Sequence, residues 1–209
     1  GSNPASQNVT PPAGCNAVVM LWSYLQGTVG AGLLSSTLNS VAPDEVFELP
    51  DAGSNTQATG VAVWYDPPTG SAIALDVEWD VNPTEGPLTG VVFVQDANTA
   101  GYRDADAVCT GGPTQQSITL TTVSSDLVIV LDQRYLTPEP STEAGYTSIL
   151  TMSNASQFGR VRTIVASGAT QTAATQDTNY SSVVGVVIPD AAGGVSIPVL
   201  GASLRMMNN

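Results

Sequence analysis

The chain has 209 residues and is 42% hydrophobic, which excludes a disordered protein and is enough to bury the core of one large β domain. It has 18 acidic and 5 basic residues, so its formal net charge is −13, and every basic residue is an arginine. This charge balance excludes binding to nucleic acid or to an anionic membrane surface, because both need clustered Lys and Arg.

Short apolar segments separated by turn residues recur along the chain and predict β-strands. We expect strands at 16–25 and 33–41, and then a short helical turn at 43–49. The segment 71–81 alternates apolar with polar side chains over its whole length, which is the strongest β pattern in the sequence. Further strands are predicted at 60–65, 90–95, 117–123, 127–131, 147–152, 160–166 and 182–188.

These strands predict the fold class. The segments 127–131 and 182–188 are apolar on both faces, which is typical of central strands covered on both sides. No helical periodicity separates the strands, and we see no internal repeat. We therefore predict an all-β protein, an antiparallel β-sandwich or jelly roll, as a single domain over 1–189.

The C-terminal residues 190–209 are predicted to form a linker and a semi-apolar tail. A free tail is normally polar, so this apolar surface should be buried. It could close its own sandwich as an edge strand, or dock on a neighbouring subunit, and Pro198 is compatible with both. We favour docking, through Ile197, Val199, Leu200, Leu204 and Met206.

The sequence lacks most of the residue types on which catalytic sites depend. Without His or Lys there is no His-based triad, usual zinc site, Schiff base or P-loop. Asp76, Glu78 and Asp80 share one strand face at about 7 Å from neighbour to neighbour, which is a spacing that glycosidase carboxyls also use. Three acids beside an apolar face are more typical of the solvated side of a strand. We therefore predict that the protein is not an enzyme.

An acidic loop suggests a calcium site. Asp96, Asn98 and Gly101 match three positions of an EF-hand loop, but Ala100 and Ala107 stand where oxygen ligands belong. A looser structural calcium site could use Asp96, Asp104 and Asp106, and an ordinary Asx-rich loop is the alternative. No other cofactor is predicted.

Two other residue pairs leave alternatives open. Trp64 and Tyr65 are adjacent on a predicted strand and so face opposite sides, which makes one of them a candidate for stacking on a glycan; packing in the core is the alternative. Cys15 and Cys109 lack metal-ligand spacing. They could form a disulfide, and we favour two thiols.

The order of strands and turns resembles a jelly-roll-like sandwich domain of bacteriophage tail, fibre and capsid-surface proteins. The resemblance covers about Thr10 to Pro189 and rests on the segments 10–19, 63–70 with the alternating strand 73–81 that follows it, 90–96 and 118–130. It implies no catalytic residues. It implies a virion-surface role, as a decoration protein, head spike or fibre module, with other virion subunits as partners and host glycan as a further contact. Independently of the resemblance, a homo-oligomer is a further expected partner state. The alternative is a secreted carbohydrate-binding module or calcium-assisted adhesin.

Overall fold

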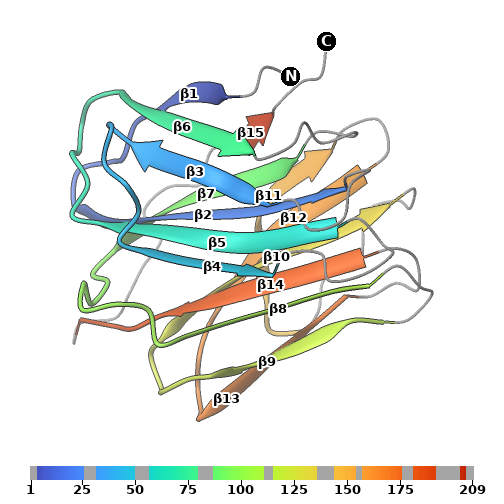
Figure 1. Cartoon of the computed structure of the whole chain (residues 1–209). Coiled ribbons are helices and arrows are strands. Elements are labelled where there is room, and N and C mark those ends of the chain that lie inside the picture. The colour runs from blue at the N-terminus through green and yellow to red at the C-terminus, as the bar shows by residue number, and fades with distance from the viewer. Residues whose placement is uncertain are drawn as a thin grey trace.

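The computed structural model describes residues 4–25, 32–49, 57–79, 87–110, 115–135, 144–153, 157–175, 181–191 and 203–205. Within these ranges the protein is all-β and every strand pairing is antiparallel, so the predicted fold class is confirmed (Figure 1). The strands are β1 (Ala5–Val9), β2 (Cys15–Leu25), β3 (Leu33–Leu38), β4 (Glu45–Leu49), β5 (Gln57–Tyr65), β6 (Ile73–Trp79), β7 (Leu88–Gln95), β8 (Asp104–Thr110), β9 (Ser117–Thr121), β10 (Leu127–Tyr135), β11 (Thr147–Ser153), β12 (Gln157–Val165), β13 (Thr170–Ala174), β14 (Ser181–Ile188) and β15 (Ser203–Arg205). The described part contains no helix that could cross a membrane.

The strands form four sheets that are stacked as layers (Figure 1). An outer three-stranded sheet has the order β1-β6-β3 and covers a five-stranded sheet with the order β15-β7-β2-β5-β4. A second five-stranded sheet follows, in the order β11-β12-β10-β14-β8. The two-stranded antiparallel sheet β13-β9 forms the last layer. The sandwich therefore has two outer layers in addition to the two central sheets.

Three hydrophobic cores hold these layers together. The central core lies between the two five-stranded sheets, and one further core lies under each outer sheet. Because successive side chains of a strand point to opposite faces, a stretch of strand that is packed against a hydrophobic core on both sides is apolar at successive positions. In β10, Ile129 enters the central core, while Val128 and Val130 enter the outer one. This confirms the prediction that 127–131 and 182–188 are covered on both faces.

The two halves of the chain have the same topology. The order β15-β7-β2-β5-β4 corresponds strand by strand to β8-β14-β10-β12-β11, and the pair β1-β6 corresponds to β9-β13. The registers agree as well: Leu21 lies opposite Val61 in β5, and Leu131 lies opposite Val161 in β12. Only β3 has no counterpart among the described strands. The fold therefore contains an internal structural repeat, which we did not see in the sequence.

The halves meet at a pair of equivalent dipeptides. Asp96-Ala97 follows β7, and Asp190-Ala191 follows the corresponding strand β14. Ala97 and Asp190 form an antiparallel bridge, in which the Ala191 amide donates to the Asp96 carbonyl at 3.0 Å. After this point each half sends its last strand to the opposite sheet: β8 pairs with β14, and β15 pairs with β7. Each central sheet thus contains strands from both halves.

Several elements differ from the sequence predictions. The helical turn expected at 43–49 is wrong, because Glu45–Leu49 pairs with β5 as an edge strand. The strands β1, β8 and β13 were not predicted. All three are polar edge strands, and they lack the two-sided apolar composition that identified the central strands. In the segment 71–81, Ile73–Trp79 alternates between buried and half-buried residues as predicted.

Candidate functional site

The structure places the two predicted glycan-stacking residues in different environments. Trp64 is 2% exposed and packs in the core under the three-stranded sheet, where its indole Nε1 donates to the carbonyl of Val41 at 3.0 Å. Tyr65 points to the opposite face, is half-buried, and packs against the central core. The opposite orientation is as predicted, and in this structure Trp64 presents no ring face to solvent.

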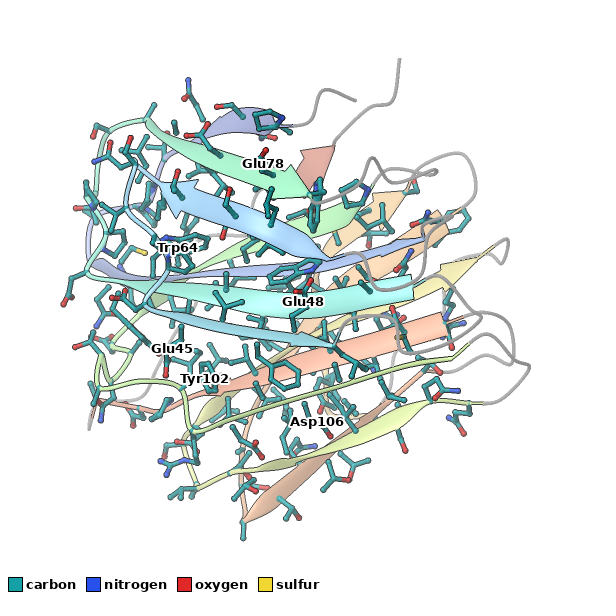
Figure 2. The ribbon with its side chains drawn as sticks, in the orientation of Figure 1. Glu45, Glu48, Trp64, Glu78, Tyr102 and Asp106 are labelled. Atoms are coloured by element: carbon teal, nitrogen blue, oxygen red, sulfur yellow. The ribbon has the colours of Figure 1, made fainter. Side chains whose placement is uncertain are left out.

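Glu45 and Tyr102 lie close together where the edges of the two central sheets meet (Figure 2), and Tyr65 joins them in a polar cluster. The Glu45 carboxylate, from the edge strand β4, accepts hydrogen bonds from the Tyr65 hydroxyl at 2.9 Å and from the Tyr102 backbone amide at 2.7 Å. Tyr102 lies two residues before β8, the edge strand of the other sheet. The Asp44 carboxylate accepts the Tyr65 amide at 2.7 Å. The cluster therefore links the edges of the two sheets.

The electrostatics of the cluster keep its phenols neutral. Burial raises the pKa of Tyr65, and the neighbouring Glu45 carboxylate raises it further. Burial and Glu45 also raise the pKa of Tyr102. A raised phenol pKa keeps Tyr65 protonated, so that its hydroxyl donates to Glu45. Because this carboxylate oxygen already accepts two hydrogen bonds, the cluster acts as a structural cross-link.

We expect Tyr65→Phe to lower the free energy of unfolding by about 0.5–1.5 kcal/mol at pH 7, because it removes the hydrogen bond to Glu45. The pKa of Tyr65 is raised in the folded state, so the contribution of its protonated hydroxyl is present below about pH 10 and is lost as the pH rises above that value. Above about pH 10, the free energy of unfolding of the Tyr65→Phe variant should therefore fall less steeply with pH than that of the wild-type protein. Urea denaturation from pH 7 to 11 checks both effects, and equal slopes for the two proteins would contradict the assignment.

The three predicted calcium ligands have different environments and different hydrogen-bond partners. Asp96 is exposed in the bridge between the halves. The Asp104 carboxylate accepts the Thr121 amide at 2.6 Å, which joins β8 to β9, and the Asp106 carboxylate accepts the Ala107 amide at 2.8 Å. Among the residues that the structure describes, no group of three or more Asp, Glu, Cys or His could hold a metal ion.

The carboxylates of β6 point away from the core beneath them. Asp76 and Glu78 are half-buried, while Leu75 and Val77 between and beside them are buried. Glu78 accepts a long hydrogen bond from the Ser35 hydroxyl at 3.4 Å. Asp80 lies outside the described residues. This arrangement is that of an outer strand face.

A second polar cluster is buried, and the sequence analysis missed it. The Asp132 carboxylate of β10 lies among three arginines, at 3.2 Å from Arg160 Nη2 and at 3.7 Å from both Arg162 Nη2 and Arg134 Nε. All four side chains are at most 4% exposed. Arg162 also lies over the Tyr146 ring, 4.8 Å from its centroid, and donates to the Ala174 carbonyl at 2.7 Å. The charged residues at every second position in Asp132-Gln-Arg134 and Arg160-Val-Arg162 were the sequence signal for it.

The corresponding position in the first half is apolar. The register places Trp22 where the second half has Asp132, and it places Gly60 and Ala62 where Arg160 and Arg162 stand. Trp22 is fully buried and makes an edge-to-face contact with Trp79 at 6.2 Å. A Cβ on Gly60 would lie 2.4 Å from the Trp22 ring, so this position needs glycine. Equivalent positions in the two halves therefore differ in chemistry: they are apolar in the first half and charged in the second.

The two cysteines are thiols in the structure, as favoured from the sequence. Cys15 is 5% exposed, and burial raises the pKa of its thiol. We expect an aromatic disulfide reagent at pH 8 to modify the half-buried Cys109 in the native protein and Cys15 only after unfolding, because the thiolate is the reactive form. Thiol counting before and after addition of denaturant tests this, and rapid native modification of Cys15 would contradict it.

In the tail, Ser203–Arg205 forms β15 and pairs with β7 of the same chain. This is the edge-strand alternative of the two that the sequence left open, and docking on a neighbouring subunit remains a prediction. Of the residues expected to dock, Leu204 lies in β15, while Ile197, Val199, Leu200 and Met206 lie outside the described residues.

Comparison of the chain with protein-family models, with curated proteins and with solved structures finds no match.

Proposed function

We propose that this chain is a non-catalytic structural protein that acts through protein–protein contacts on the surface of a bacteriophage particle. The observation that carries the non-catalytic part is the use of its carboxylates. In the described residues Asp44, Glu45 and Asp104 accept backbone amides that tie strands together, and Asp132 is surrounded by arginines. Groups committed to such bonds stabilise a scaffold and are poorly placed to exchange protons with a substrate.

The remaining features support a surface role. A net charge of −13 keeps a protein soluble at high local concentration. Five large apolar side chains are about half exposed and are available for contacts with other subunits: Leu34, Val41, Val46, Val123 and Val165. The phage setting itself is supported by the resemblance over Thr10 to Pro189 in strand order and turn chemistry. That step is an analogy of fold.

The test is binding of the purified protein to phage particles stripped of it, measured by co-sedimentation. We expect saturable binding that Val46→Asp or Val165→Asp weakens at least tenfold, because a charge in an apolar interface is costly. Ser167→Asp, on an exposed turn, is the matched control. Wild-type protein that does not bind any particle would overturn the proposal.

A glycan array and a panel of polysaccharides separate the proposal from its rivals. We expect neither turnover nor specific binding. Glycan binding lost in Tyr65→Phe or Tyr102→Phe would favour a secreted carbohydrate-binding module. Hydrolysis abolished by Asp76→Asn or Glu78→Gln would show an enzyme.

A further inference from the structure

We propose that the exposed side chains of Leu34, Val41 and Val46 form a docking surface, here called the β3 surface, for a positively charged segment of a different protein. The β3 surface is one of the protein–protein contacts of the proposed function, on which this assignment rests. It adds the chemistry of the partner, which presents aliphatic side chains flanked by Lys or Arg.

Most of the exposed apolar side chains lie on one short stretch of the chain. Of the five large ones in the described residues, Leu34 and Val41 are each 59% exposed and Val46 is 48% exposed. The strand β3 is also the one strand of the first half that has no counterpart among the described strands of the second half. Residues that are added to a rigid scaffold in this way often serve in binding.

Val41 and Val46 are joined by a residue that lies beneath them. The Trp64 indole donates to the carbonyl of Val41 at 3.0 Å. Val46 lies opposite Ala62 in the register of β4 and β5, and Ala62 packs in the same core as Trp64. Because directly opposite residues share a face of the sheet, Val46 is on the face of β4 that adjoins this core.

Leu34 is joined to the same face by a carboxylate. Glu48 lies two residues after Val46 in β4, so both side chains are on one face of the strand. The Glu48 carboxylate accepts the backbone amide of Leu33 at 2.7 Å, which places the start of β3 beside it (Figure 2). Leu34 follows directly. The three exposed side chains therefore belong to one surface.

The hairpin that carries Val41 is held in one shape. Leu38 and Val41 exchange backbone hydrogen bonds at 2.8 and 3.0 Å around a two-residue turn. Both turn residues, Asn39 and Ser40, have positive φ, at 52° and 66°. This is the geometry of a type I′ turn, whose twist matches that of the flanking strands. A surface that is already ordered loses little conformational entropy when it binds a partner.

The described charges that border the β3 surface are all negative. Asp44 is exposed at the start of β4, and Glu48 lies beside Leu33. On β6, Asp76 lies opposite Thr37 of β3, and Glu78 accepts a hydrogen bond from the Ser35 hydroxyl at 3.4 Å. The described arginine side chains are elsewhere: Arg103 pairs with Asp126, and three are buried in the second half, namely Arg134, Arg160 and Arg162.

These charges decide between a second copy and a different protein. Two copies that met through their β3 surfaces would bring carboxylates against carboxylates, and like charges across an interface are costly. A segment with Lys or Arg beside aliphatic residues would instead cover the apolar side chains and place its cations against the carboxylates. The geometry and the charge of the β3 surface therefore fit a basic segment of a different protein.

The test measures binding of short synthetic peptides to the purified full-length protein by isothermal titration calorimetry. One peptide alternates lysine with valine, a second alternates lysine with serine, and a third alternates glutamate with valine. We expect the lysine–valine peptide to bind about tenfold more tightly than either of the others, because it alone supplies both apolar contacts and cations. Its binding should weaken as the ionic strength rises from about 0.01 to about 1 M, since the screening length falls from about 30 to about 3 Å.

Substitutions locate the binding. Leu34→Ser, Val41→Ser and Val46→Ser should each weaken binding of the lysine–valine peptide about fivefold. The matched controls are Val123→Ser and Val165→Ser, the same kind of change at side chains of similar exposure in the other half of the chain, and they should bind like the wild-type protein. Circular dichroism checks that each variant is folded, and three variants guard against the loss of one.

Three results would overturn the assignment. The first is equal binding of the lysine–valine and lysine–serine peptides, or no binding of either. The second is binding that the variants on the β3 surface leave unchanged. The third is a concentration-dependent dimer that Leu34→Ser abolishes in sedimentation, because the occupant of the β3 surface would then be a second copy. No phage particle takes part, so these results are separate from those of the particle-binding test.

Discussion

Asp132→Asn should lower the free energy of unfolding by about 3–5 kcal/mol, the usual cost of removing one partner from a buried ion pair. The substitution keeps the shape of the side chain but removes its charge from a site where three arginine side chains approach within 3.7 Å and are at most 4% exposed. Buried guanidinium groups cannot lose their protons to relieve the imbalance. Urea denaturation followed by far-UV circular dichroism measures the change.

The matched control is Asp76→Asn, the same chemical change on the half-buried outer face of β6. It should alter the free energy of unfolding by no more than about 0.5 kcal/mol. If Asp132→Asn is as mild as this control, the arginines are neutralised elsewhere and Asp132 is not the centre of the cluster.

Trp22→Ala should lower the free energy of unfolding by about 3–5 kcal/mol as well, through a different cause. Trp22 is fully buried, lies against Gly60 and contacts the edge of Trp79. Its removal opens a cavity between β2 and the outer sheet, and a close-packed interior relaxes only in part. Denaturation followed by circular dichroism is again the measurement, because the substitution also alters tryptophan fluorescence.

Trp22→Phe is the control for this site. It keeps an aromatic ring packed against Gly60. We therefore expect it to lower the free energy of unfolding by less than half as much as Trp22→Ala. The comparison with Asp132→Asn is informative in itself, because the two residues occupy equivalent positions. Equal losses for Trp22→Ala and Trp22→Phe would mean that the cost does not come from the cavity.

The sequence predicts the central strands well because their signal is local. In 127–131 of β10 and 183–188 of β14 successive residues are apolar because both faces are covered, and in β6 every second residue is apolar because one face is covered, so the pattern follows directly from burial. The edge strand β4 reads Glu-Val-Phe-Glu-Leu, which is compatible with a helical turn or a strand. Its conformation is decided by pairing with β5, a contact that no local pattern encodes.

The polar clusters were harder to predict, because they depend on register. Glu45 meets Tyr102 across two sheets, 57 residues apart in the chain, and Asp132 meets Arg160 across a strand pair. The repeat was hidden for a related reason. Equivalent positions such as Trp22 and Asp132 differ completely in chemistry, so sequence similarity between the halves is lost even where strand order and register are kept.

The crossing of β8 and β15 between halves also governs when the protein can fold. During synthesis, β8 leaves the ribosome about 70 residues before its partner β14, and β7 receives β15 only when residues 203–205 have been made. Neither central sheet can be completed from one half alone. We therefore expect the complete fold to form only once residues 203–205 have been made, with slow kinetics because most pairings are distant in sequence. Until then the nascent chain exposes the edges of β7 and β14, and it should depend on chaperones to avoid aggregation.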